Sequence, residues 1–212
     1  MGKEIAASYG VKTEQFLTGF KFIGDRIDYY EKHGGPHFEF GYEESYGCLI
    51  APFARDKDGL QAITMYCEMA LYYYLQGKTL DVIWEELGQR FGYHEDKVFS
   101  IAFSGSEGSE KMKAITKQLH ENPFIELNGQ KVVKADDFLK LETTDGKQVE
   151  KIDLPKSDVV KLYFADHTEI SVRPSGTEPK IKFYIGVIGK SLEDARSKPD
   201  VYYQEIKKFL GI

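Results

Sequence analysis

The sequence predicts two domains of different class: an α/β domain with a mixed sheet and helices over residues 1–94, then an α+β domain with an antiparallel sheet and few helices over residues 95–212. In the first part, strand-like and helical runs intermix, which is typical of α/β organisation. In the second part, alternating runs separated by turn signals outnumber helical ones, which favours an antiparallel sheet. A chain of 212 residues with 42% apolar content is long enough to build such cores.

The first part begins with helical runs that glycines interrupt. Residues 3–9 are typical of the end of a helix that Gly10 stops, and residues 25–33 predict a second helix. We expect a short strand at residues 37–40, where polar and apolar residues alternate. An apolar segment at residues 48–51 follows a loop.

A long helix is predicted next, capped by Asp56 or Asp58. Its apolar residues recur at helical spacing, so we expect this Met- and Tyr-rich stripe to be core. Thr79 is placed to cap the following helix, in which we expect Trp84 to be buried. The stripe consists of Leu60, Ile63, Cys67, Ala70, Leu71 and Tyr74.

The second part has more strand-like runs. A helix is expected over residues 109–120, a turn at Asp145-Gly146, and an amphipathic segment at 192–210 that Pro199 breaks near its start. The expected strands cover residues 98–103, 131–138 and 159–164.

Composition excludes several function classes. The net charge of −6 argues against general binding of nucleic acid or anionic membranes. Glu68 interrupts the most apolar stretch, and the N-terminus lacks a signal-peptide pattern, so we expect a cytoplasmic protein. Cys48 and Cys67 show no redox or metal spacing and predict buried free thiols. The five histidines also lack metal-ligand spacing, so we expect no metal site.

Residues 173–182, which we call the anion loop, join two runs of alternating residues at 169–172 and 180–187. An arginine can bind two phosphate oxygens, hydroxyls can donate to others, a glycine lets the backbone approach, and a lysine adds charge. An ordinary turn is the alternative, since Pro, Ser, Gly and Thr are common turn residues. The candidate anion-binding residues are Arg173, Ser175, Gly176, Thr177 and Lys182.

Glu43-Glu44-Ser45 is a second candidate site. Residues two apart after a strand can face the same side, so Glu43 and Ser45 can together bind sugar hydroxyls. A helix-capping or turn cluster is the alternative.

Thr18, Gly19 and Lys21 form a third candidate, in which a glycine allows close approach and a lysine supplies charge. A plain turn is the alternative. Arg55 and Lys57 are either first-turn charges or further cations of the same site.

These three strings resemble the α-D-phosphohexomutases, the phosphoglucomutase/phosphomannomutase family, over the whole chain. The resemblance implies that the chain holds the third and fourth domains. It implies that the anion loop binds the non-reacting phosphate, that Glu43 and Ser45 bind the 3- and 4-hydroxyls, and that the Thr18 string lies at the cleft entrance. The sequences of the Thr18 and Glu43 strings look most like those of the branch that includes phosphoglucomutase-2 and phosphopentomutase relatives.

What the resemblance implies about function extends beyond this chain. Family members interconvert hexose 1-phosphate and hexose 6-phosphate through a phosphoserine and a bisphosphorylated sugar, with Mg²⁺ held by an Asp-x-Asp-x-Asp run. Neither motif is present here. We therefore expect a C-terminal part, without its first strand, with no catalytic residue and inactive alone. Mg²⁺ and a hexose 1,6-bisphosphate activator would belong to the intact enzyme, whose N-terminal domains are the expected partner and whose substrates are hexose or pentose phosphates. A non-catalytic phosphosugar-binding module is the alternative.

Overall fold

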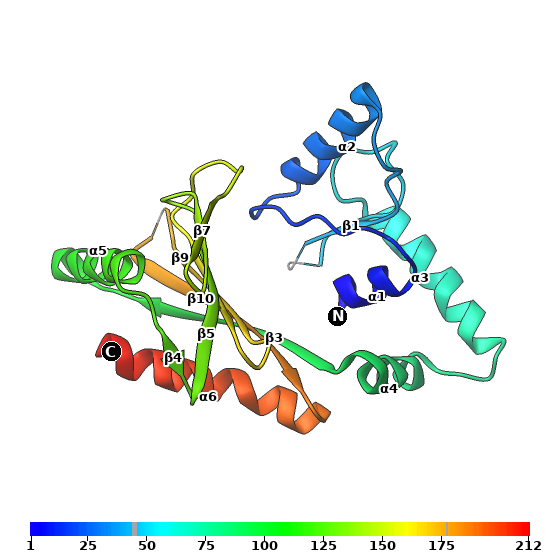
Figure 1. The fold of residues 1–212 in the computed structure, drawn as a ribbon. Coiled ribbons are helices and arrows are strands. Elements are labelled where there is room, and N and C mark those ends of the chain that lie inside the picture. The colour runs from blue at the N-terminus through cyan, green and yellow to red at the C-terminus, as the bar shows by residue number, and fades with distance from the viewer. Residues whose placement is uncertain (44–45, 177) are drawn as a thin grey trace. The chain divides into compact units, whose positions relative to one another are not determined.

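The computed structural model describes residues 1–43, 46–176 and 178–212, and the chain in it forms two units (Figure 1). The N-terminal unit covers residues 2–86, and the C-terminal unit covers residues 87–212 together with Met1. The division falls inside a helix and precedes the boundary expected from the sequence. Among the predicted site residues, Ser45 and Thr177 lie outside the described part.

The C-terminal unit is built on an antiparallel sheet, which confirms the predicted α+β class. Its strand order is β3-β10-β9-β8-β5-β6-β7, and β4 pairs with β5. All described strand pairs of this unit are antiparallel. In chain order the elements are β3 (Tyr93–Ala102), α5 (Gly105–Glu121), β4 (Glu126–Leu127), β5 (Gln130–Asp137), β6 (Glu142–Asp145), β7 (Gln148–Lys151), β8 (Val160–Phe164), β9 (Glu169–Pro174), β10 (Lys180–Gly189) and α6 (Leu192–Leu210).

One face of this sheet is apolar, and α5 and α6 cover it. Every second residue of β10 is buried because successive side chains point to opposite faces. Ile115 and Leu119 of α5 join Tyr202 and Ile206 of α6 in the same cluster. Each fully buried aliphatic or aromatic side chain contributes about 1.5–3 kcal/mol. The strand residues of this core include Leu162, Ile170, Ile181, Phe183, Ile185 and Val187.

Three features of this unit differ from the expectation. Helix α5 begins at Gly105, earlier than predicted, and the Asp145-Gly146 turn joins two strands, β6 and β7, that the alternation did not indicate. Pro199 does not break α6. Proline inside a helix costs about 3 kcal/mol, and here Pro199 is buried in the face of α6 that also buries Tyr202 and Ile206. This packing outweighs the lost backbone hydrogen bond.

The N-terminal unit is mostly helical in its described part. Its core consists of Phe20, Ile27 and Leu49. No described residue from 37 to 40 is in a strand, so that prediction was wrong; β1 begins at Gly41 and pairs only with the two-residue β2. The elements are α1 (Gly2–Ser8), α2 (Lys21–His33), β1 (Gly41–Tyr42), β2 (Cys48–Leu49), α3 (Gly59–Tyr74) and α4 (Leu80–Phe91), whose last turns fall in the other unit.

Helix α3 is placed as predicted but not buried as predicted. Asp58 caps it, because its side chain accepts from the backbone N–H groups of Leu60 and Gln61. No residue of α3 is buried; Cys67 is exposed, and so is Trp84 of α4. The periodicity of apolar residues indicates which side chains tend to be buried. The described part of this unit contains no layer that buries them. None of the described helices is long and apolar enough to cross a membrane.

Candidate functional site

The anion loop brings two cations together. Arg173 near the end of β9 lies directly opposite Lys182 of β10, so their side chains leave the same face of the sheet. Both residues are exposed, and neither forms an ion pair with another described residue. Like charges directly opposite each other repel. An anion bound between them would turn this repulsion into attraction.

Backbone hydrogen bonds shape the loop between the two strands. The Ser175 N–H donates to the Lys180 carbonyl at 2.7 Å, and the Glu178 N–H donates to Oγ of Ser175 at 3.3 Å. The Phe103 N–H donates to the Pro179 carbonyl at 2.8 Å, which ties the loop to the end of β3. These bonds hold Ser175 and Glu178, among the described residues of the loop, close to the ends of β9 and β10.

Gly176 faces open space. A Cβ added there would have no neighbour within 4 Å, and its φ is not in the left-handed region. The glycine is thus not required by a turn or by packing within the described residues. Its missing side chain leaves open space beside the backbone, and binding of an anion there stays a prediction.

The acidic residue of the loop is already paired. Glu178 lies 2.8 Å from the ammonium of Lys180. This hydrogen bond, followed by the charges of Lys180 and Lys182, lowers the pKa of Glu178. Because Glu178 is engaged by Lys180, the cations left for an external anion are Arg173 and Lys182.

The candidate sugar site lies in the N-terminal unit, after β1. The Glu43 N–H donates to the Gly47 carbonyl at 2.9 Å, which closes the loop between β1 and β2. The side chain of Glu43 is only 13% exposed. A Cβ on Gly47 would lie 2.7 Å from its Oε1, so the glycine makes space for the carboxylate.

Lys57 connects this carboxylate to the Thr18 string. Its Nζ lies 3.9 Å from Oε1 of Glu43 and 5.7 Å from the centre of the Phe20 ring. Phe20 is buried between Gly19 and Lys21 of that string. Lys57 also pairs with Asp56 at 3.0 Å, and this hydrogen bond raises the pKa of Lys57. The structure thus brings Glu43, Lys57 and the Phe20 turn together.

The other predicted residues of this unit are placed differently. Thr18 is exposed, Gly19 has φ +126°, and Lys21 begins α2 with its ammonium 4.9 Å from the Phe22 ring. Arg55 pairs with Glu31 of α2 and also donates to the Pro52 carbonyl. Its guanidinium therefore holds α2, whereas Lys57 is the cation beside Glu43.

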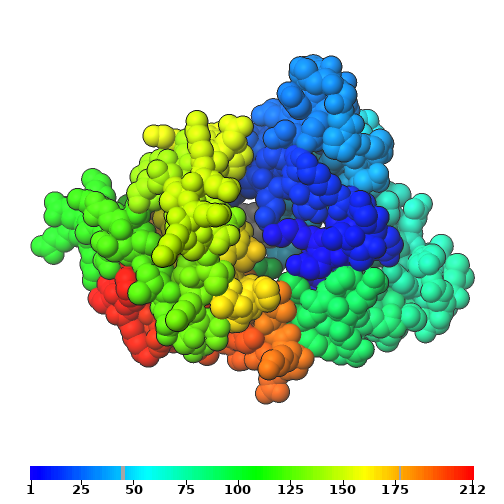
Figure 2. Space-filling view, in the orientation of Figure 1, coloured from blue at the N-terminus to red at the C-terminus, as the bar shows by residue number. Residues whose placement is uncertain are grey.

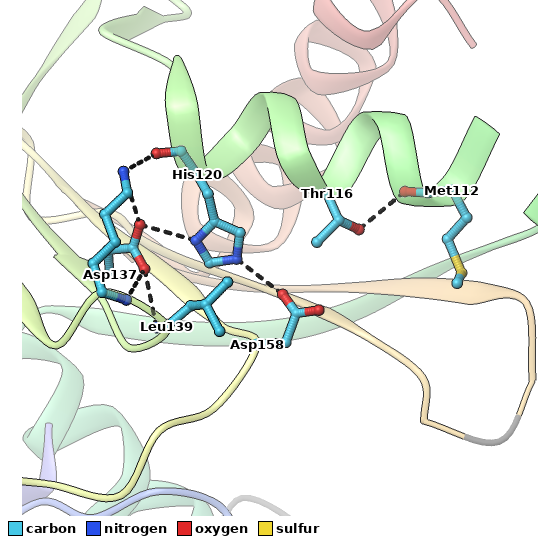
Figure 3. A network of polar contacts seen from close by, with 7 residues as sticks. Met112, Thr116, His120, Asp137, Leu139 and Asp158 are labelled. Atoms are coloured by element: carbon cyan, nitrogen blue, oxygen red, sulfur yellow. Dashed lines mark hydrogen bonds and ion pairs between the residues drawn. The ribbon is translucent and has the colours of Figure 1, made fainter. Parts of the chain in front are cut away.

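A polar network in the C-terminal unit was not indicated by the sequence (Figure 3). The ring nitrogens of His120 lie 2.9 Å from the carboxylates of Asp137 and Asp158. The Lys140 ammonium lies 3.2 Å from Asp137 and donates to the His120 carbonyl. These residues come from α5, β5 and loops far apart in the chain, so no local spacing could reveal them.

Residues of this network line a cavity that also reaches the first residues of the anion loop. A cavity of about 410 Å³ is lined by His120 and Asp158 together with Pro174, which follows Arg173. Burial by itself would raise the pKa of Asp137. The hydrogen bond from the Lys140 N–H and the pairing with His120 have the larger effect, so the pKa of Asp137 lies below its ordinary value. The network joins the end of α5 to the sheet.

Metal-binding chemistry finds no support in the described residues. No group of three His, Cys, Asp or Glu side chains in this part of the chain could hold a metal ion.

Comparison with known proteins gives the same assignment for both units. The family domain described as "Phosphoglucomutase/phosphomannomutase, alpha/beta/alpha domain III" matches residues 1–91. The domain described as "Phosphoglucomutase/phosphomannomutase, C-terminal domain" matches residues 110–195.

Individual relatives are considerably longer than this chain. Phosphoglucomutase of Staphylococcus aureus strain bovine RF122 / ET3-1 is 39% identical over 198 residues, which cover 92% of this chain and 35% of that protein. The protein of strain MSSA476 is 38% identical with the same coverage.

A solved structure has the same fold. The open form of the Paramecium exocytosis-sensitive phosphoprotein pp63/parafusin, a phosphoglucomutase, is similar with a TM-score of 0.63 at 21% identity, over 99% of this chain and 35% of that one. The chain therefore spans about a third of the length of these proteins. With both of its units matched in order, it belongs to the phosphoglucomutase/phosphomannomutase family and comprises domain III and the C-terminal domain.

Proposed function

We propose that this chain is the C-terminal part of a phosphohexomutase that interconverts hexose 1-phosphate and hexose 6-phosphate through a phosphoserine enzyme and a bisphosphorylated sugar. The part described here would bind the sugar hydroxyls and the phosphate that is not reacting. The observation that carries the proposal is the opposed pair of Arg173 and Lys182, two exposed cations that form no ion pair with a described carboxylate.

At the phosphate end, the chemistry follows from donor geometry. The planar guanidinium of Arg173 can donate two parallel hydrogen bonds to phosphate oxygens, and Lys182 adds a compact charge. Ser175 and Thr177 are proposed to donate from their hydroxyls, and the open space at Gly176 admits the anion to the backbone. Charge-assisted bonds of this kind contribute about 1.5–3 kcal/mol each.

At the sugar end, Glu43 is the proposed acceptor. A carboxylate can accept from two neighbouring hydroxyls at once, and Lys57 lies close enough to hold its charge in place. Ser45, Thr18, Gly19 and Lys21 are proposed to contribute as the family resemblance implies. The 3- and 4-hydroxyls are equatorial in glucose and in mannose, so this set of residues is compatible with both sugars.

The reacting groups are proposed to lie in the remaining part of the enzyme. The family match and the length of the relatives support this assignment. We propose that the phosphoserine, Mg²⁺ and the hexose 1,6-bisphosphate activator belong to the intact cytoplasmic enzyme. The isolated chain would bind phosphosugar without converting it.

Calorimetric titration tests the phosphate site. Wild-type chain should bind inorganic phosphate and glucose 6-phosphate weakly and with similar affinities, and Arg173→Ala should lose on the order of 1.5–3 kcal/mol of binding. Lys97→Ala is the matched control, since Lys97 is an exposed lysine of the same sheet that already pairs with Asp200 at 2.8 Å. Equal effects of the two substitutions would overturn the assignment of Arg173.

A non-catalytic binding module is the competing function, and the same titration separates the two. Glu43→Ala should change the affinity of the isolated chain for glucose 6-phosphate little. If it weakened binding as much as Arg173→Ala, this chain would bind the sugar by itself and the module would be favoured. Conversion of glucose 1-phosphate to glucose 6-phosphate by the pure chain would contradict the proposed absence of catalytic groups.

A further inference from the structure

Lys182 has a directly opposed neighbour on each side, because β10 lies between β9 and β3 in the sheet (Figure 1). On one side it faces Arg173 of β9, and on the other side it faces Ser100 of β3. Directly opposed residues of antiparallel strands project from the same face, with Cβ atoms about 4.5–5.5 Å apart. The three side chains therefore form one row across three strands, and Ser100 extends the pair of cations to β3.

This row lies on the face of the sheet opposite to the apolar core. Within each strand, successive side chains point to opposite faces, and the neighbours of the row point into the core. These neighbours are Phe99, Ile101, Val172, Ile181 and Phe183. Ser100, Lys182 and Arg173 are all exposed. Atoms in gold, the colour of β9, form part of the surface of this unit in Figure 2. The row is thus accessible to a ligand from solvent.

The hydroxyl of Ser100 is available for a ligand. It forms no hydrogen bond with another described residue. Serine is also not among the residues that favour strands, which are mainly β-branched and aromatic. If this position served stability alone, a carboxylate opposite Lys182 would be expected, because an opposite charge would offset the repulsion between the two cations. A neutral donor at this position leaves Lys182 unpaired with any described carboxylate.

The end of β3 is held beside the anion loop. The Phe103 N–H donates to the Pro179 carbonyl at 2.8 Å, and Ala102 lies opposite Lys180 at the start of β10. Ser100 precedes Ala102 by two residues and therefore shares its face of the sheet. The methyl group of Ala102 offers no donor. Counted back from the loop, Ser100 is therefore the first residue of β3 whose side chain can donate a hydrogen bond on this face.

We propose that Ser100 is a further ligand of the bound phosphate and donates its hydroxyl hydrogen to a phosphate oxygen. The proposal rests on the proposed function, in which Arg173 and Lys182 bind the non-reacting phosphate of a hexose phosphate. A phosphate group presents three strong acceptor oxygens, so it accepts from several donors at once. Serine suits the position because it adds a donor without a negative charge that would repel the anion.

Titration of the full chain with inorganic phosphate, followed by NMR, tests the role of the hydroxyl. Ser100→Ala should weaken phosphate binding about tenfold, as expected for the loss of one hydrogen bond to a charged group. Ser100→Thr keeps a hydroxyl and should retain most of the affinity. Ser171→Ala is the matched control, since Ser171 lies on the same face but in the next row, opposite Tyr184. Urea unfolding of these variants should differ little from that of the wild type.

Ser100→Asp gives a test in the opposite direction. A carboxylate opposite Lys182 should form an ion pair with it, so the C-terminal unit should become more stable at low salt. The same carboxylate should repel phosphate, and binding should be lost. Unchanged phosphate affinity in Ser100→Asp would overturn the proposal, because it would show that the anion does not lie near this position.

The other outcomes separate this proposal from the proposed function. Equal affinities of wild type and Ser100→Ala would overturn the role of Ser100, as would equal losses in Ser100→Ala and Ser171→Ala or a loss that Ser100→Thr fails to restore. Arg173→Ala in the same titration reports on the proposed function. A loss in Arg173→Ala with none in Ser100→Ala would overturn only the role of Ser100. Retained binding in both variants, or no binding by the wild type, would overturn the proposed phosphate site as well.

Discussion

Arg173 and Lys182 occupy directly opposed positions on β9 and β10, two cations facing each other across one strand pair. Such a pair costs folding free energy, since like charges opposite each other destabilise a sheet by roughly 0.2–1 kcal/mol. By contrast, Lys161 of β8 and Glu169 of β9, diagonal neighbours in the same sheet, carry opposite charges that lie 2.6 Å apart. The opposed cations are therefore a local conflict of the kind found at binding sites.

Replacing Lys182 by Ala should stabilise the C-terminal unit while weakening anion binding. The expected gain in free energy of unfolding is about 0.2–1 kcal/mol, and it should shrink as salt screens the repulsion. Urea unfolding at low and high ionic strength measures it. Lys97→Ala should do the opposite and lose a little stability, because Lys97 is paired with Asp200. A loss of stability in Lys182→Ala would contradict the repulsion argument.

Gly176→Ala should leave the fold intact and weaken phosphate binding. Apart from the chain neighbours of Gly176, no atom of a described residue lies within 4 Å of the added methyl group, and φ lies outside the left-handed region, so the change in stability should stay within about 0.5 kcal/mol. Gly189→Ala is the contrasting variant, since a Cβ there would lie 2.4 Å from the backbone nitrogen of Ala195. Thermal unfolding and phosphate titration of both variants check this. Unchanged phosphate affinity in Gly176→Ala would show that the anion does not approach this backbone.

Tyr163 should make the C-terminal unit sensitive to alkaline pH. Burial raises the pKa of Tyr163, and its hydroxyl donates to Asp136 at 2.7 Å, which raises that pKa further. The unfolded tyrosine ionises near pH 10 and the folded one at higher pH. Its contribution to stability is thus complete below pH 10 and is lost as the pH rises above it. Urea unfolding from pH 8 to 11 should show a flatter profile for Tyr163→Phe; parallel profiles would exclude this role.

Asp137 should make the stability of the C-terminal unit sensitive to acid pH. Burial raises its pKa, but the backbone N–H of Lys140 and the pairing with His120 lower it more, so the folded pKa lies below the unfolded one. The contribution to stability is present above about pH 4 and is lost as the pH falls through the folded pKa. Asp137→Asn should cost on the order of 1–3 kcal/mol at neutral pH and weaken the acid dependence. Unfolding between pH 6 and 2 measures both, with Asp145→Asn in the β6–β7 turn as control.

Local chemistry explains where sequence-based expectations hold. The cap at Asp58, the turn at Asp145-Gly146 and the opposed strands around the anion loop each depend on residues close together in the chain. Periodicity also indicates the buried faces of α5 and α6. These features require no knowledge of distant segments, so the sequence by itself determined them, along with Arg173 and Lys182 as neighbours.

Packing between segments that are distant in the sequence decided the other side-chain contacts and which apolar residues are buried. His120 meets Asp137 and Asp158 only because the chain folds α5 against the sheet, and Arg55 turns to Glu31 because α2 lies beside it. Pro199 stays helical because α6 is buried on the sheet. The apolar periodicity of α3 is equally clear in the sequence, yet its side chains remain exposed. A pattern of apolar residues indicates which face of a helix tends to be buried, but burial itself requires a surface that another segment provides.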